Sequence, residues 1–229
     1  MENKNNNFLA ISIFAAAIII GGSLIYSAGL NDPGKANVGE ALEKSNFPEI
    51  GNSVALGDKS APLTLFVYGD FQCSYCVKFF KETEPLIRQN YVETGKVKIV
   101  HKDLSFLGQA SVDAANAVKC AKDQSKYWQY HDALYLAREA ELIAGTSGAF
   151  SRANLEKIAS DIEMDTEKFM NCFDAKKYSS EVLEDADEAA RVMTQISTPT
   201  VFVGTAMIQG AYPYADFESA IEAALAEME

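Results

Sequence analysis

The chain has 229 residues, of which 48% are hydrophobic and 23% are charged, as in ordinary folded proteins and unlike disordered chains. Its 20 Lys and Arg against 32 Asp and Glu give a net charge of −12, which argues against sequence-independent nucleic-acid binding, because that requires basic residues opposite the phosphates. Four cysteines are too few to hold together a small disulfide-rich domain, and a chain of this length does not need them for that purpose.

The N-terminal region contains a long apolar run. From Phe8 to Tyr26 nearly every residue is apolar, and a helix over this run would be about 28 Å long, the thickness of the hydrocarbon core of a bilayer. This predicts an uncleaved signal anchor, a single transmembrane helix within residues 1–28, that places the rest of the chain outside the cytoplasm. A cleaved signal peptide is the alternative, although Tyr26 would then occupy a cleavage-site position that prefers small residues. No cysteine precedes Cys73, which excludes a lipoprotein anchor.

Residues 29–52 are rich in Gly, Asn, Asp and Pro, which predicts a linker. A βαβ unit is expected in residues 53–106, because an apolar, β-branched run is followed by a helical pattern and a second such run. Its elements are a strand at 63–68, a helix from Cys73 to about Tyr91 that Pro85 should kink, and a strand at 97–100.

The pattern is helical from residue 107 to residue 196, with no strand-like run. We expect helices at 108–123, 125–139, 151–160, 165–173 and 175–195. Strand character returns in residues 197–229, which predict strands at 200–203 and 206–209, a tight turn between them, and a helix at 214–228. The order predicts an α/β protein in which βαβ and ββα halves form one four-stranded sheet, with an all-helical insertion between them.

The motif Cys73-Ser74-Tyr75-Cys76 follows the first strand directly and begins a helix. Residues three apart lie on the same helix face, so the two sulfurs can form a bond. At the helix N-terminus, unpaired backbone N–H groups and the helix dipole stabilise the Cys73 thiolate, which is the reactive form. Cys76, one turn further on, is expected to be the resolving thiol. The pair predicts a catalytic centre that works by thiol–disulfide exchange.

Three other interpretations of this motif are weaker. A zinc site with four cysteine ligands usually shows a second close pair, whereas Cys120 and Cys172 are far apart in the sequence. A purely structural Cys73–Cys76 bridge would constrain the unfolded chain very little, because the loop it closes is so short. A Cys–His protease needs a lone nucleophile, whereas Cys73 has a second cysteine three residues further along the chain. We therefore expect no metal and no other cofactor.

Three segments together resemble the DsbA-like thiol–disulfide oxidoreductases. They are the active-site segment 63–76, the helical segment Lys126–Tyr135 and the loop Ser197–Gly204. The resemblance covers about residues 53 to 229. It implies a thioredoxin fold with an inserted helical domain, and it implies that Pro199 is cis and faces the cysteine pair.

A cis-proline at this place has a physical reason. The peptide bond before proline is the only one that becomes cis at low cost. A cis bond before Pro199 would expose the backbone of Thr198 beside Cys73, so that an extended substrate could add to it as a strand. Thr198 and Pro199 are therefore the expected substrate-binding residues. A trans proline that opens a strand is the alternative.

Two positions depart from the family pattern. Oxidising members often carry His directly before the second cysteine, where this chain has Tyr75. Without an imidazolium there, the Cys73 thiolate loses one source of stabilisation. Many relatives also have a buried acid six residues before the first cysteine, where this chain has Val67. Proton transfer during exchange must then use another group or water, and both departures leave the redox direction open.

Cys120 and Cys172 could be two buried free thiols, which behave as small apolar residues. We expect a structural disulfide between them instead, because the chain is predicted to lie outside the cytoplasm and some similar relatives carry cysteines at these places.

The remaining candidates have structural interpretations. His131 lies among aromatic residues on one predicted helix face, and His101 follows the second strand, so both are expected in the core. The acidic run at 181–188 is expected to form a solvated helix face. It comprises Glu181, Glu184, Asp185, Asp187 and Glu188.

The sequence thus predicts an extracytoplasmic, membrane-anchored, single-pass protein thiol–disulfide oxidoreductase that oxidises cysteines of secreted proteins. A disulfide reductase or isomerase with the same residues, or a non-catalytic polypeptide-binding module, is the alternative. The expected partners are unfolded or reduced secreted polypeptides and a membrane redox partner, either a quinone-linked oxidase or an electron donor. Residues 27–52 are too few for the dimerisation domain that isomerases of this kind carry, which favours a monomer.

Overall fold

The computed structural model describes residues 47–228. The predicted signal anchor at residues 1–28 and most of the predicted linker lie outside the described residues. Between residues 47 and 228, no helix combines the length and the apolar character needed to cross a bilayer.

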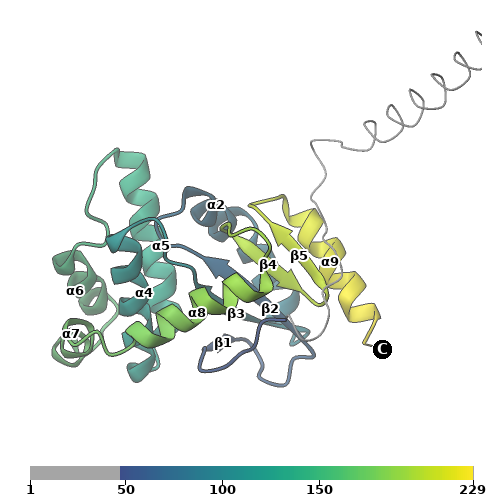
Figure 1. The fold of residues 1–229 in the computed structure, drawn as a ribbon, viewed down its shortest axis with the longest axis horizontal. Helices are drawn as coiled ribbons and strands as arrows, with labels where there is room; N and C mark the ends of the chain where they lie inside the picture. The colour runs from purple at the N-terminus through teal and green to yellow at the C-terminus, as the bar shows by residue number, and fades with distance from the viewer. Residues whose placement is uncertain (1–46, 229) are drawn as a thin grey trace, which may run out of the picture. The chain divides into compact units, whose positions relative to one another are not determined.

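A mixed five-stranded sheet forms the centre of the fold, in the order β1-β3-β2-β4-β5 (Figure 1). The strands are β1 (Ala55–Leu56), β2 (Leu63–Gly69), β3 (Val97–Asp103), β4 (Thr200–Val203) and β5 (Ala206–Gln209). β2 and β3 are parallel, and the other neighbours are antiparallel. The expectation of four strands was wrong by one edge strand, because β1 has only two residues and is too short to show an alternating pattern.

The helices follow the predicted pattern closely. The first group is α2 (Ser74–Glu82), α3 (Glu84–Ile87) and the π-helical turn η2 (Arg88–Val92). The second group is α4 (Gln109–Ala121), the 3-10 turn η3 (Lys122–Gln124), α5 (Tyr127–Ala144), α6 (Arg152–Asp161), α7 (Thr166–Asp174) and α8 (Ser179–Val192). The helix α9 (Tyr214–Ala226) follows β5. The predicted break near Pro85 is confirmed, because the helix is interrupted at Thr83 and Pro85 lies in the first turn of α3.

Helices cover both faces of the sheet. On one face, α2, α3 and α9 bury apolar residues of β2, β3 and β4, with Phe79 and Phe217 in contact at a ring-centroid distance of 5.2 Å. On the other face, α8 crosses the sheet and packs on Phe66, Tyr68 and Phe202 (Figure 1). The strands β2 and β4 are thus buried on both sides, as their nearly unbroken apolar sequences predict.

Five helices, α4 to α8, lie between β3 and β4 in the chain, as expected. Of these, α4, α5, α6 and α7 gather beside the sheet (Figure 1), and they share an apolar core with the start of α2. The predicted disulfide between Cys120 and Cys172 is present and joins α4 to α7 with a Cα–Cα distance of 5.9 Å.

Candidate active site

The loop between β2 and α2 is built around the carboxylate of Asp70, which is fully buried. Its Oδ1 accepts the backbone N–H of Gln72 at 2.8 Å, and its Oδ2 accepts the N–H groups of Phe106 and Leu107 at 3.1 Å each. Its backbone carbonyl accepts the N–H of Cys73 at 2.9 Å. Asp70 therefore fixes the entry to α2 and ties it to the loop after β3. The sequence analysis did not identify Asp70 as part of the site; the preference of aspartate for hydrogen-bonding a nearby backbone N–H was the available signal.

Cys73 occupies the N-cap position of α2 and has extended backbone dihedral angles. A hydrogen bond from the Cys76 thiol lowers the pKa of Cys73 to about 6 against the opposing effect of burial, with help from Thr198 and from the backbone of Cys76 and Tyr75. The predicted thiolate at the helix N-terminus is thus supported by the local geometry.

Cys76 is 2% exposed, and burial raises its pKa well above the ordinary thiol value. The same hydrogen bond to Cys73 and the negative charge of that neighbour act in the same direction. Both cysteines are free thiols in this structure. The two sulfurs of the motif therefore differ in acidity, and the Cys73 thiol is the more acidic of the pair.

The loop before β4 brings Thr198 and Pro199 to the cysteine pair. The peptide bond between them is cis, as expected. The Sγ of Cys73 lies 3.5 Å from the carbonyl oxygen of Thr198. The expected meeting of the Cys73 and Thr198 segments at one place is therefore found.

Large apolar side chains are exposed around this place. Tyr75 is 64% exposed directly beside the cysteines, and Phe106 and Leu107 are about half exposed on the loop that Asp70 holds. Ile196, at 43% exposed, precedes the Thr198 loop by one residue. Apart from Tyr75, which belongs to the motif, these residues were not predicted as part of the site, because the sequence does not show which apolar residues are exposed.

An aromatic layer lies beneath the cysteine pair. Phe71 contacts His101, His131 and Tyr135 at ring-centroid distances of 5.2, 5.5 and 4.8 Å. His101 is 2% exposed and His131 is fully buried, so the expectation that both histidines belong to the core is confirmed. Val67 lies on β2 in register with His101 on β3.

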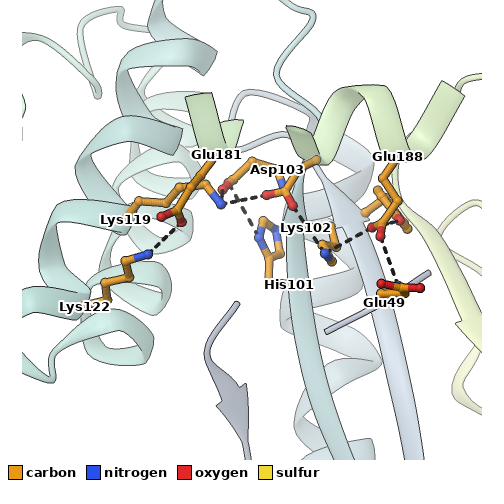
Figure 2. Close-up of polar contacts among 10 residues, drawn as sticks. Glu49, His101, Lys102, Asp103, Lys119, Lys122, Glu181 and Glu188 are labelled. Atoms are coloured by element: carbon orange, nitrogen blue, oxygen red, sulfur yellow. Dashed lines mark hydrogen bonds and ion pairs between the residues drawn. The ribbon is translucent and has the colours of Figure 1, made fainter. Parts of the chain in front are cut away.

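The expected solvated face on α8 was wrong for two of its five acidic residues. Asp185 and Glu188 are only 5% and 8% exposed. Asp185 lies 2.7 Å from Lys119 and 3.4 Å from Lys102. Glu188 lies 3.1 Å from Lys102 (Figure 2). The reason is that lysines of β3 and α4 lie beneath α8, a pairing between distant segments that an acidic run alone cannot reveal.

We found no group of three or more His, Cys, Asp or Glu side chains between residues 47 and 228 that could hold a metal ion.

Comparison with known proteins places this geometry in a family. A family model described as thioredoxin matches residues 49–223. The sodium/proton antiporter NhaA 1 of Salinispora arenicola is 29% identical over 172 residues, which are 74% of this chain and 24% of that protein, so the chain spans about a quarter of this relative. Disulfide bond formation protein D of Bacillus subtilis is 28% identical over 181 residues, 78% of this chain and 79% of the relative.

Solved structures agree with this result. Oxidised BdbD of Bacillus subtilis superimposes with a TM-score of 0.67 at 25% identity, covering 78% of this chain and 96% of the other. Alpha-DsbA1 of Wolbachia pipientis has the same fold, with a TM-score of 0.69 at 20% identity over 80% of this chain and 96% of the other. The chain therefore belongs to the thioredoxin family, and within it the chain is similar to disulfide bond formation protein D and to DsbA.

Proposed function

We propose that this protein forms disulfide bonds in proteins outside the cytoplasm, with Cys73 as the nucleophile and Cys76 as the resolving thiol. The observation that carries the proposal is the difference in acidity within the motif. The pKa of Cys73 is lowered to about 6 at the N-cap of α2, while burial raises that of Cys76. A stabilised Cys73 thiolate favours the reduced form of the pair, so the oxidised pair readily takes electrons from a substrate.

The reaction begins with Cys73 and Cys76 joined. A substrate thiolate attacks the Sγ of Cys73, the bond to Cys76 breaks, and Cys76 leaves as a thiolate that takes up a proton because its pKa is high. A second substrate thiolate then attacks the substrate sulfur of the mixed disulfide, and Cys73 leaves as a thiolate. The substrate has lost two electrons and gained a disulfide, and the cysteine pair has gained the two electrons.

Substrates of this site would be extended polypeptides. The backbone of Thr198, beside the Cys73 sulfur, supports strand-like pairing with such a chain, and Pro199 sets its direction. The exposed side chains of Tyr75, Phe106 and Leu107 supply apolar contacts for unfolded segments, which expose such side chains themselves. We therefore assign substrate binding to Thr198 and Pro199.

The apolar run at residues 8–26 supports a membrane anchor, and the protein would work as a monomer on the outer side of the membrane. There it would be reoxidised by a membrane partner, most simply a quinone-linked oxidase. The domain limits given above, with a linker at 29–52 and a helical insertion at 107–196, complete this proposal.

A reductase is the second candidate, because Tyr75 replaces the histidine that often helps to stabilise the thiolate in oxidising relatives. The reduction potential separates the two. The full-length chain would be equilibrated with glutathione buffers and its redox state followed by Trp128 fluorescence. We expect a value between those of thioredoxin, about −270 mV, and DsbA, about −120 mV. A potential at or below that of thioredoxin would overturn the oxidase and favour the reductase.

A further inference from the structure

The reaction moves a proton on and off Cys76, whose side chain has almost no contact with solvent. The position six residues before Cys73, where many relatives hold a buried acid, is occupied by Val67, which cannot carry a proton. The proton therefore needs a different route in this chain.

The first part of that route lies on the neighbouring strand. His101 of β3 is in register with Val67, and its Nε2 lies 3.3 Å from the hydroxyl of Tyr135. Both atoms reach the end of β2 directly before the cysteine loop. A Cβ added to Gly69 would lie 2.7 Å from the His101 Nε2 and 2.8 Å from the Tyr135 hydroxyl, so only glycine leaves room for them.

Cys76 and Tyr135 are buried in the same apolar cluster. The backbone of Asp70, the residue after Gly69, hydrogen-bonds the Cys76 sulfur. Tyr135 stacks on Phe80, one helical turn beyond Cys76, with a ring-centroid distance of 5.1 Å. After burial, the charge of Cys76 is the largest influence that raises the pKa of Tyr135.

The second part of the route begins at the other ring nitrogen of His101. Its Nδ1 lies 3.7 Å from the Oδ1 of Asp103, both side chains are at most 2% exposed, and neither atom has a hydrogen-bond partner among the described residues. The Oδ2 of Asp103 lies 3.1 Å from the Nζ of Lys119 (Figure 2). The Nζ of Lys119 also lies 2.7 Å from the Oδ2 of Asp185.

The far end of this chain of groups reaches solvent. Lys119 and Asp185 line a cavity of about 210 Å³ whose other walls include exposed residues such as Gly51 and Asn52. Figure 2 shows the row of side chains that runs from His101 and Asp103 through Lys102 to Glu188, whose Oε1 accepts the backbone N–H of Glu49 at 3.0 Å. A proton on Asp103 is thus two groups away from water.

The charge states suit a proton exchange. Burial lowers the pKa of His101 well below its ordinary value, with His131 and Lys119 adding to the effect, so its ring is neutral. Burial raises the pKa of Asp103 to about 7; Lys119 opposes this shift, and Asp185 and Asp70 add to it. The titratable and charged groups that face Asp103 and His101 are Asp70, Lys119, Tyr127, His131, Tyr135 and Asp185.

We propose that Asp103 stores the proton of Cys76 and exchanges it through His101 and Tyr135, while Lys119 and Asp185 connect Asp103 to solvent. This inference rests on the proposed function. When Cys76 leaves as a thiolate, the Tyr135 hydroxyl gives it a proton and takes one from Nε2 of His101. In the same concerted step, protonated Asp103 gives its proton to Nδ1 of His101, so that the neutral ring exchanges one tautomer for the other. Reoxidation runs the same transfers in reverse, and Cys76 attacks as a thiolate.

The test is the reoxidation of the reduced full-length chain by oxidised glutathione in a stopped-flow instrument, followed by Trp128 fluorescence. At saturating glutathione the rate is that of Cys76 attacking the mixed disulfide on Cys73. In the wild type we expect this rate to rise with pH through a midpoint near 7 and to be slower in heavy water. Asp103→Asn should lower it about tenfold or more at pH 7 and remove the midpoint. In Asp103→Ala, added formate should restore part of the rate.

Glu84→Gln is the matched control. Glu84 is 3% exposed, is ion-paired with Arg88 at 2.6 Å, and also raises the pKa of Tyr135, but it is not part of the route. Its rate should stay within about twofold of the wild type. His101→Gln repeats the test at a second position if circular dichroism shows that the Asp103 variants are unfolded.

Two outcomes would contradict the route in different ways. Folded Asp103→Asn and His101→Gln chains whose limiting rate and pH profile match the wild type would overturn the route and leave the proposed function standing. A wild-type chain that never forms a mixed disulfide with glutathione would overturn the proposed function and the route with it.

Discussion

Cys73 and Thr198 are 125 residues apart in the sequence, yet the sulfur of one lies 3.5 Å from the carbonyl oxygen of the other. The contact joins the helix that follows β2 to the loop that precedes β4, and these strands are hydrogen-bonded neighbours in the sheet. Cys73, the proposed nucleophile, and the backbone proposed to hold a substrate beside it are therefore positioned by the same pair of strands.

Replacing Cys76 by alanine should trap substrates on the protein. Without the resolving thiol, a mixed disulfide on Cys73 cannot be released by intramolecular attack. We expect covalent adducts with a reduced, unfolded test protein that are visible on non-reducing gels and disappear with reductant. Cys73→Ala is the control and should form none; adducts through Cys120 or Cys172 would show that the roles are assigned wrongly.

The reactivity of Cys73 should depend on pH with a midpoint near 6. Its lowered pKa of about 6 means that the thiolate is already the main form at pH 7 and is lost as the pH falls through 6. Iodoacetamide alkylation of the reduced chain, measured by mass from pH 4 to 9, should rise through that midpoint. The buried Cys76 should react far more slowly throughout, because its pKa is raised. A midpoint near 8.5, the value of an ordinary thiol, would contradict the assignment.

The bond between Cys120 and Cys172 should resist conditions that reduce the Cys73–Cys76 pair. Mild reduction followed by alkylation should label only the cysteines of the motif, whereas labelling of all four would show that the second disulfide is labile. The bond spans 52 residues of sequence. The double variant Cys120→Ala/Cys172→Ala should lose up to roughly 4 kcal/mol of unfolding free energy on the chain-entropy model, measured by urea titration.

Lys119→Met should destabilise the protein strongly. It leaves the buried carboxylates of Asp103 and Asp185 without the ammonium group between them, and breaking a buried ion pair costs about 3–5 kcal/mol. Lys122→Met is the matched control one helical turn away, because its pair with Glu181 is partly exposed and should be worth less than about 1 kcal/mol. Equal losses in the two variants would contradict this account.

Much of the fold could be predicted from the sequence, because its signals are local. The runs at 63–68 and 200–203 are apolar enough to identify buried strands, and Pro85 marks the break between α2 and α3. Only the first β-strand was missed, since its two residues take their conformation from pairing with Val100 and Ile99 of β3.

The site could be predicted only in part. Cys73 and Cys76 are recognisable from their spacing, and Thr198 and Pro199 from their context. The burial of Asp185 could not be predicted, because it depends on Lys102 and Lys119, which are 66 or more positions away in the sequence. The same holds for the contact between His101 and Tyr135, which lie on different elements.

The disulfide between α4 and α7 has a consequence for how the protein matures. If the proposed function holds, a newly exported copy arrives with four thiols and must itself be oxidised before its helical segment is locked. Oxidised copies can form the Cys120–Cys172 disulfide in newly made copies through Cys73. The rate at which new copies mature would therefore increase with the amount of oxidised enzyme already present. A cell with none of the finished protein would then start slowly, and its lag would shorten when a small amount of oxidised enzyme is supplied from outside.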